Sequence, residues 1–62
     1  MTQEAKNALA EVINAINEKS TKLAEDVKKE TDLTVLPMML GGLYALACLS
    51  ETLTKLWKEE QE

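Results

Sequence analysis

The stretch from Leu33 to Ser50 places the tightest limit on what this chain can fold into. It carries no charged residue, in a chain in which 29% of residues are charged. Its centre, residues 36–49, reads LPMMLGGLYALACL. A run this apolar must be removed from water. Four surroundings can do this: a lipid bilayer, the rest of this chain, a second copy of the chain, or a different protein.

The length of the chain limits how much it can bury by itself. Its 62 residues form one domain at most, and chains this short usually need disulfides, a metal or self-association to be stable. The single cysteine, Cys48, cannot form an internal disulfide, and the absence of histidine excludes an ordinary zinc site. We therefore expect no metal and no cofactor, and self-association is what remains.

The charge balance excludes one class of partner. The chain has 7 lysines, no arginine and 11 acidic residues, for a net charge of -4. A surface that binds nucleic acid needs clustered basic residues, whereas here the lysines alternate with glutamates, so we expect no nucleic-acid partner. The first residues, MTQEAKN, lack the basic start and apolar core of a secretory signal. We predict an acidic cytoplasmic protein.

Residues 2–30 are predicted to form the first helix, because they contain no glycine or proline and are rich in helix-forming residues. Their apolar residues recur at two heptad positions, which is typical of a helix that packs along one seam. The seam consists of Leu9, Ile16 and Leu23 at one position and Ile13, Ser20 and Val27 at the other. The stripe is widened by Ala5, Val12 and Ala24, as in a helix packed into a bundle.

The face farthest from this seam is acidic. Four glutamates recur there at seven-residue intervals and are called the acidic rail below: Glu4, Glu11, Glu18 and Glu25. Outward heptad positions are usually charged, so the first interpretation is a solvated face. The alternative is that the rail contacts a basic partner.

A turn and a second helix follow. The periodicity fails at residues 31–36 and Pro37 comes next, which fits the first turn of a helix. We predict a turn over 31–36 and a helix over about 37–58, so that residues 1–62 form a single helical-hairpin domain. The expected seam of the second helix is Met39, Leu46 and Leu53 at one position and Gly42, Leu49 and Leu56 at the other, with Leu43 and Trp57 beside it.

The bilayer is a poor match for the apolar run. A spanning helix needs about 20 apolar residues, but Pro37 leaves only 38–49 as uncharged helix. Twelve residues rise about 18 Å, which is short of a hydrocarbon core of about 30 Å. A membrane-associated peptide is therefore the third hypothesis.

A single hairpin is also an incomplete answer. Apolar residues point in every direction around residues 38–49: Leu40 and Ala47 lie off the seam and Tyr44 lies opposite it. A helix that is apolar all round must be buried on several sides. We therefore predict an all-α antiparallel hairpin that dimerises into a four-helix bundle. The second helices would meet in a close contact that small residues permit, namely Gly41, Gly42 and Ala45.

The predicted interface gathers the apolar residues of both helices. It consists of Leu9, Ile13, Ile16, Leu23, Val27, Met39, Leu40, Leu43, Leu46, Leu49, Leu53, Leu56 and Trp57. Met38, Met39 and Cys48 are interpreted as packing residues, and Trp57 as a packing residue or an interface anchor. Three charge pairs at favourable spacing are expected to support the helices: Glu18 with Lys22, Glu25 with Lys29, and Glu51 with Lys55.

The sequence offers no equipment for catalysis. It contains no histidine, no glycine-rich phosphate loop and no nucleophile beside a plausible base. We predict a small non-enzymatic protein that self-associates and acts as a protein-binding module or regulator. The alternative is a subunit whose apolar second helix docks on a different protein, with the acidic rail attracting a basic surface.

In length and in its two heptad helices the chain resembles the plasmid Rop-type dimers. That resemblance implies a dimeric bundle that binds RNA hairpins through a basic face of the first helix. Here the outer face of the first helix carries Glu4, Glu11, Glu18 and Glu25. RNA binding is therefore not expected of this chain.

Overall fold

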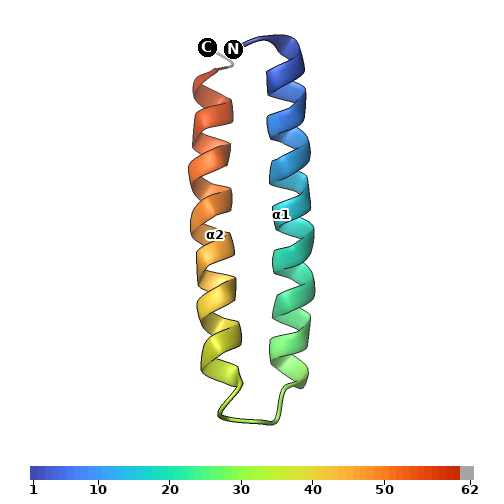
Figure 1. The fold of residues 1–62 in the computed structure, drawn as a ribbon, viewed down its shortest axis with the longest axis vertical. Helices are drawn as coiled ribbons and strands as arrows, with labels where there is room; N and C mark the ends of the chain where they lie inside the picture. The colour runs from blue at the N-terminus through green and yellow to red at the C-terminus, as the bar shows by residue number, and fades with distance from the viewer. Residues whose placement is uncertain (61–62) are drawn as a thin grey trace.

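The chain is an antiparallel pair of helices. A computed structural model describes residues 1–60, with α1 at Gln3–Lys29 and α2 at Leu36–Glu59. Figure 1 shows the two helices side by side, with their connection at one end and the start of α1 near the end of α2 at the other. The predicted all-helical hairpin is confirmed, and each helix begins and ends within one residue of the expected ranges.

The ends of the helices are specified locally. The hydroxyl oxygen of Thr2 accepts a hydrogen bond from the Ala5 amide at 3.1 Å, which caps α1. Lys28 and Lys29 lie in its last turn, where positive charge is favourable. Pro37 lies in the first turn of α2, where its missing amide hydrogen costs nothing.

Two carboxylates organise the loop between the helices. Glu30 Oε1 accepts from the amides of Thr31 and Asp32, at 3.1 and 2.9 Å. Asp32 Oδ1 accepts from the Thr34 hydroxyl at 2.7 Å and from the Thr34 amide at 2.8 Å. These bonds satisfy loop amides that no helix can satisfy. Because the Thr34 hydroxyl and amide stabilise its charged form, the pKa of Asp32 lies below its ordinary value of 3.8.

The seam of α1 contains the residues that the heptad pattern predicts. Each is half-buried against α2: Leu9, Ile13, Ile16, Ser20, Leu23 and Val27.

The seam of α2 differs from the prediction at one heptad position. Its half-buried residues are Met39, Leu46 and Leu53, as expected, together with Leu43, Ser50 and Trp57. Gly42, Leu49 and Leu56 are exposed instead, the two leucines to 47% and 39%. Both groups of residues recur every seven residues. The prediction chose the group with Leu49 and Leu56 because leucine is more apolar than serine. The structure instead brings Trp57 between the helices and pairs Ser50 with α1.

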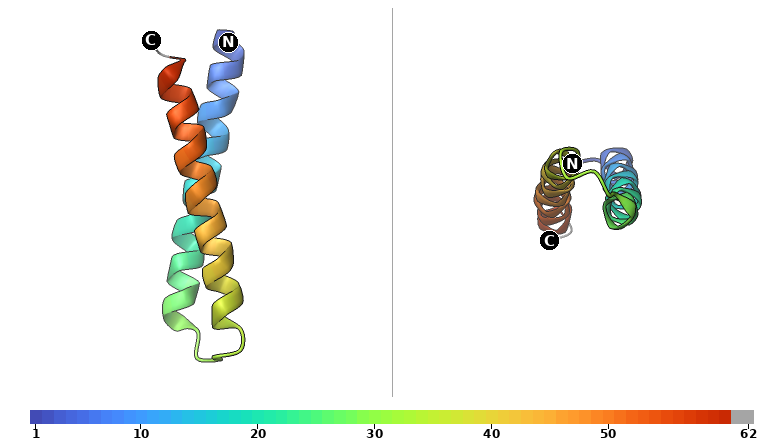
Figure 2. Two further views of the ribbon diagram at one scale, coloured as in Figure 1. Left: turned by 90° about the vertical axis from the view of Figure 1, so that its left-hand side faces the viewer. Right: turned by 90° about the horizontal axis from the view of Figure 1, so that it is seen from below.

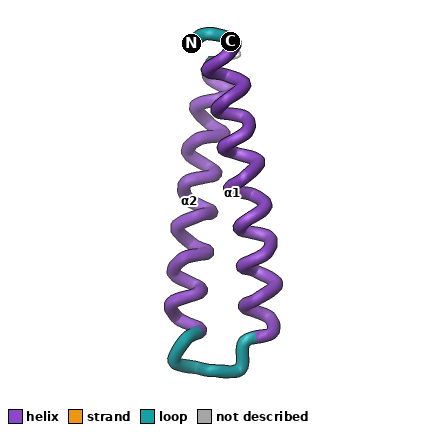
Figure 3. The backbone as a smooth tube through the Cα atoms, turned by 45° about the vertical axis from the view of Figure 1, so that its right-hand side comes forward, coloured by secondary structure: helices purple, strands orange, loops and turns teal. Residues whose placement is uncertain are grey.

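The hairpin forms a single layer. Figure 2 and Figure 3 show two helices that cross at a shallow angle, with no third element against either one in residues 1–60. The molecule is 45 Å long and 14 by 12 Å across. No side chain among residues 1–60 is fully buried, because each helix has only one neighbour to cover it.

Candidate interaction surface

The outer surface of α2 is apolar near the loop. Met38 is 77% exposed and Tyr44 is 73% exposed. Cys48 is also exposed. The expectation that Met38 and Cys48 are packed is therefore wrong for the single hairpin, because both lie away from the seam and only α1 is available to cover α2.

Two flanks of the hairpin lie on either side of the seam. In an antiparallel pair, the residues just before Ile13, Ser20 and Val27 lie on the same side as those just before Leu43, Ser50 and Trp57. We call this side the Val12 flank; it contains Val12, Lys19, Asp26, Gly42, Leu49 and Leu56. A groove on this flank is lined by Lys19, Lys22, Leu23, Asp26 and Leu46.

The Val12 flank is most apolar toward the chain ends. There Val12 is 48% exposed, Leu49 47% and Leu56 39%. Alanines at residues 5, 8 and 15 add small side chains beside Val12. Toward the loop, α1 contributes charged residues to this flank while α2 stays apolar. The flank therefore offers a continuous apolar strip on α2 and a half-charged strip on α1.

The opposite flank has a polar centre, and we call it the Asn17 flank. It contains Ala10, Asn17, Ala24, Leu40, Ala47 and Thr54. The Ser50 hydroxyl donates to Asn17 Oδ1 at 2.7 Å. This bond ties the middle of α2 to the middle of α1. This bond was not predicted from the sequence. Each helix has a small polar residue at a seam position, Ser20 and Ser50, which indicates that the seam is not purely apolar.

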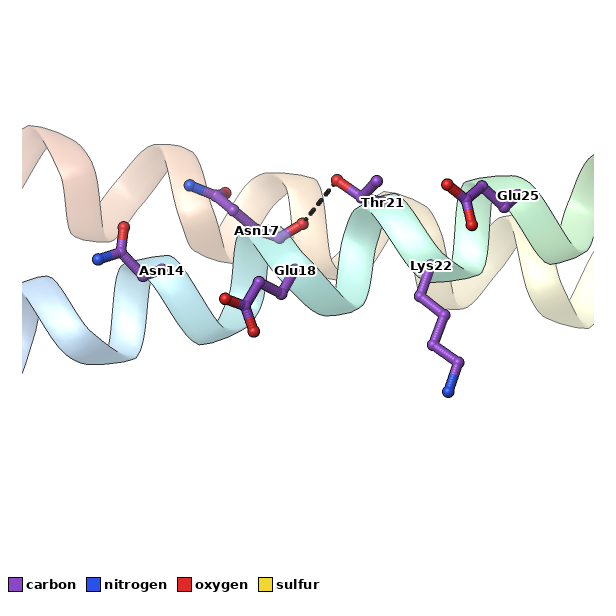
Figure 4. Close-up of a pocket in the computed structure, with 6 residues that line it drawn as sticks. All are labelled: Asn14, Asn17, Glu18, Thr21, Lys22 and Glu25. Atoms are coloured by element: carbon purple, nitrogen blue, oxygen red, sulfur yellow. Dashed lines mark hydrogen bonds between the residues drawn. The ribbon is translucent and has the colours of Figure 1, made fainter.

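The outer face of α1 carries the acidic rail. Figure 4 shows a shallow groove there, lined by side chains that all come from α1: Asn14, Asn17, Glu18, Thr21, Lys22 and Glu25. The Thr21 hydroxyl donates to the Asn17 carbonyl oxygen at 3.0 Å, and the Lys22 side chain points away from the carboxylates of Glu18 and Glu25. One helix cannot enclose a ligand or exclude water from these carboxylates, so this groove offers no environment for acid–base chemistry.

The predicted charge pairs within each helix do not form. Among residues 1–60 the ion pair present is between the Met1 amino group and Glu60, at 3.4 Å. Pairs between exposed side chains at this spacing gain little in water, because solvent screens the attraction and ordering two long side chains costs entropy. Glu18, Glu25 and Glu51 are exposed and form no ion pair among residues 1–60.

The thirteen predicted interface residues divide into two groups in the hairpin. Ten are half-buried in the seam. The other three are exposed, on the Val12 flank for Leu49 and Leu56 and on the Asn17 flank for Leu40.

The comparisons with known proteins leave the surface to be interpreted by itself. No protein-family model matches the chain, and no curated protein or solved structure is significantly similar to it. By length and composition alone, α2 is able to cross a membrane, with a hydropathy of 1.3 over its window of 18 residues.

Proposed function

We propose that this chain is a non-enzymatic protein-binding module that works as a homodimeric four-helix bundle. The observation that carries the proposal is that a hairpin with two long helices leaves no side chain among residues 1–60 fully buried. A domain this small has little apolar burial to offset the entropy lost on folding. A second hairpin laid against the first would supply the missing burial.

The Val12 flank is the side that such a second hairpin would cover. Leu49 and Leu56 lie there next to seam residues that are themselves only half-buried. Covering this flank therefore removes both the exposed leucines and the open side of the seam from water. The Asn17 flank gains less, because its centre is a hydrogen-bonded polar pair.

The second half of the acidic rail, Glu18 and Glu25, remains outside in a bundle built this way, because it lies on the far side of α1. It is the surface of the module that would attract a basic protein, by steering its approach. A second candidate function, docking of a single hairpin on a different protein, is favoured by the exposure of Met38 and Tyr44 on the outer side of α2. Tyr44 lies away from both the seam and the Val12 flank, whereas Met38 lies at the outer edge of that flank.

Light scattering coupled to size-exclusion chromatography tests the proposal. We expect a particle of twice the 6.9 kDa chain mass at micromolar concentration. A folded particle of single-chain mass across the whole concentration range contradicts it and favours docking on a different protein. Solubility only in detergent favours the membrane hypothesis instead.

A further inference from the structure

Four charged residues form a line along one edge of α1. An ideal helix of 3.6 residues per turn brings Glu4, Glu11, Lys22 and Lys29 within about 20° of one another around its axis. Glu4 and Glu11 are the first half of the acidic rail, and Lys22 and Lys29 continue their line on the side of α1 toward the Val12 flank. The first half of the line is acidic and the second half is basic, so the line has the opposite sign at its two ends.

The line is symmetric about the middle of α1. Glu4 and Lys29 are centred between Ile16 and Asn17, and so are Glu11 and Lys22. Within one chain these partners are about 38 and about 16 Å apart along the axis, because each residue rises about 1.5 Å. None of the four forms an ion pair among residues 1–60. A second α1 running antiparallel would place each glutamate opposite a lysine.

The apolar strip on α2 is also symmetric about a central residue. Leu49 lies midway between Gly42 and Leu56. The same twofold rotation therefore sets Leu49 against Leu49 and places Leu56 over Gly42, a large side chain over a missing one. In the hairpin, a Cβ added to Gly42 would meet only Leu23 Cδ2, at 3.6 Å, so space remains on that side of Gly42.

The two centres lie at the same level of the molecule. The hydrogen bond from the Ser50 hydroxyl to Asn17 Oδ1, at 2.7 Å, joins the residues next to them. A single twofold axis at this level therefore pairs the opposite charges of the two α1 helices and also places Leu56 of one copy over Gly42 of the other.

We infer that the second copy lies antiparallel on the Val12 flank, with α1 against α1, α2 against α2, and the twofold axis at the level of Asn17 and Ser50. Four ion pairs, each between Glu4 and Lys29 or between Glu11 and Lys22 of different copies, close the α1 edge. The inference rests on the self-association proposed above and adds its geometry. The alternative, α1 against α2 of the second copy, leaves these charges facing Met38, Ala45 and Thr52.

Two charge-exchanged variants test this geometry. One carries Glu4→Lys and Glu11→Lys, and the other carries Lys22→Glu and Lys29→Glu. Alone, each variant sets like charges against each other at all four contacts, whereas a mixed dimer has opposite charges at all four. We expect the dissociation constant of each separate variant to rise on the order of 10-fold or more at low salt. Native mass spectrometry of the mixture should show mixed dimers in clear excess, and less so at high salt.

A matched control removes the effect of net charge. Glu18→Lys with Glu25→Lys makes the same change in charge on the rail, but its symmetry-related residues are Ala15 and Ala8. This control should mix with the Lys22→Glu, Lys29→Glu variant less selectively than the Glu4→Lys, Glu11→Lys variant does. Circular dichroism of every variant checks that the helices are retained.

The outcomes separate this inference from the proposed function. Mixed dimers in excess over the control support the antiparallel α1 contact. Dimers that mix in the statistical proportion, or equally with the control, overturn the geometry and leave self-association standing. An unmodified chain that stays monomeric at every concentration overturns the self-association and the geometry with it.

Discussion

The two helices have similar lengths but present very different surfaces. On α1, the side away from the seam carries the acidic rail, and the apolar residues are confined to the seam and the sides next to it. On α2, apolar side chains occupy the seam, the Val12 flank and the outer side, where Tyr44 is 73% exposed. The difference supports the proposal that α2 determines how the protein associates, because a helix apolar on several sides must be covered on several sides.

Leucine truncations on α2 give the largest expected effect. Leu46 lies half-buried in the seam, whereas Leu49 lies on the Val12 flank and is 47% exposed in the hairpin. If a second copy covers the flank, Leu46→Ala and Leu49→Ala should each lower the free energy of unfolding by about 2 to 5 kcal/mol. Denaturant unfolding at several protein concentrations measures this, and its midpoint should move with concentration.

Tyr44→Ala is the control, because Tyr44 lies on the outer side of α2. It should change stability by no more than about 0.5 kcal/mol. If Leu49→Ala changes neither the free energy of unfolding nor the mass of the particle, the Val12 flank is open to water. In that case α2 needs no more covering than α1.

The pattern on α1 could be predicted from the sequence, and the pattern on α2 only in part. On α1, the apolar residues lie on one side of the helix and the charged residues on the other, so only one apolar stripe can face α2. On α2, Gly42, Leu49 and Leu56 repeat at the same interval as Leu43, Ser50 and Trp57. Hydrophobicity favours the first set. Packing against α1 selects the second set. That packing cannot be predicted from the sequence of α2 alone.

The candidate surface was predictable in composition but not in arrangement. The excess of apolar residues around α2 already indicated a second molecule. Which leucines stay exposed depends on the register between the helices, and the register depends on contacts such as Asn17 with Ser50. A contact between residues so distant in sequence cannot be read from heptad spacing.

The bond between Asn17 and Ser50 offers a second test, of how the two helices are held in register. Ser50→Ala and Asn17→Ala should each destabilise the hairpin by about 0.5 to 1.5 kcal/mol, which is typical of one hydrogen bond. The double variant should cost less than the sum of the two single variants, since both remove the same bond. Strictly additive losses in unfolding experiments would contradict a contribution of this bond to stability.

The paired glycines sharpen the comparison within α2. An added Cβ at Gly41 would meet nothing within 4 Å, and at Gly42 only Leu23 at 3.6 Å. Gly41→Ala should therefore stabilise the protein by about 0.5 to 1 kcal/mol, since alanine favours the helix. Gly42→Ala should give the same gain to a single hairpin, but a smaller gain or a loss in a dimer in which Leu56 of the second copy packs over Gly42. Equal gains, measured by thermal unfolding, argue against that contact.

The smallest effect is expected in the loop, which belongs to neither helix surface. The Thr34 hydroxyl, followed by the Thr34 amide, lowers the pKa of Asp32 below 3.8. A carboxylate whose pKa is lowered by folding stabilises the folded state above the unfolded pKa, and this contribution is lost as the pH falls through the lower, folded value. Asp32→Asn should therefore reduce stability slightly at neutral pH and make little difference in strong acid. Thermal unfolding of both proteins from about pH 6 to about pH 2 measures this, over a range that includes the ordinary carboxyl pKa. Asp26→Asn, on α1 outside the loop, is the control, and an equal pH dependence for the two variants would show that the Thr34 bonds do not stabilise the loop.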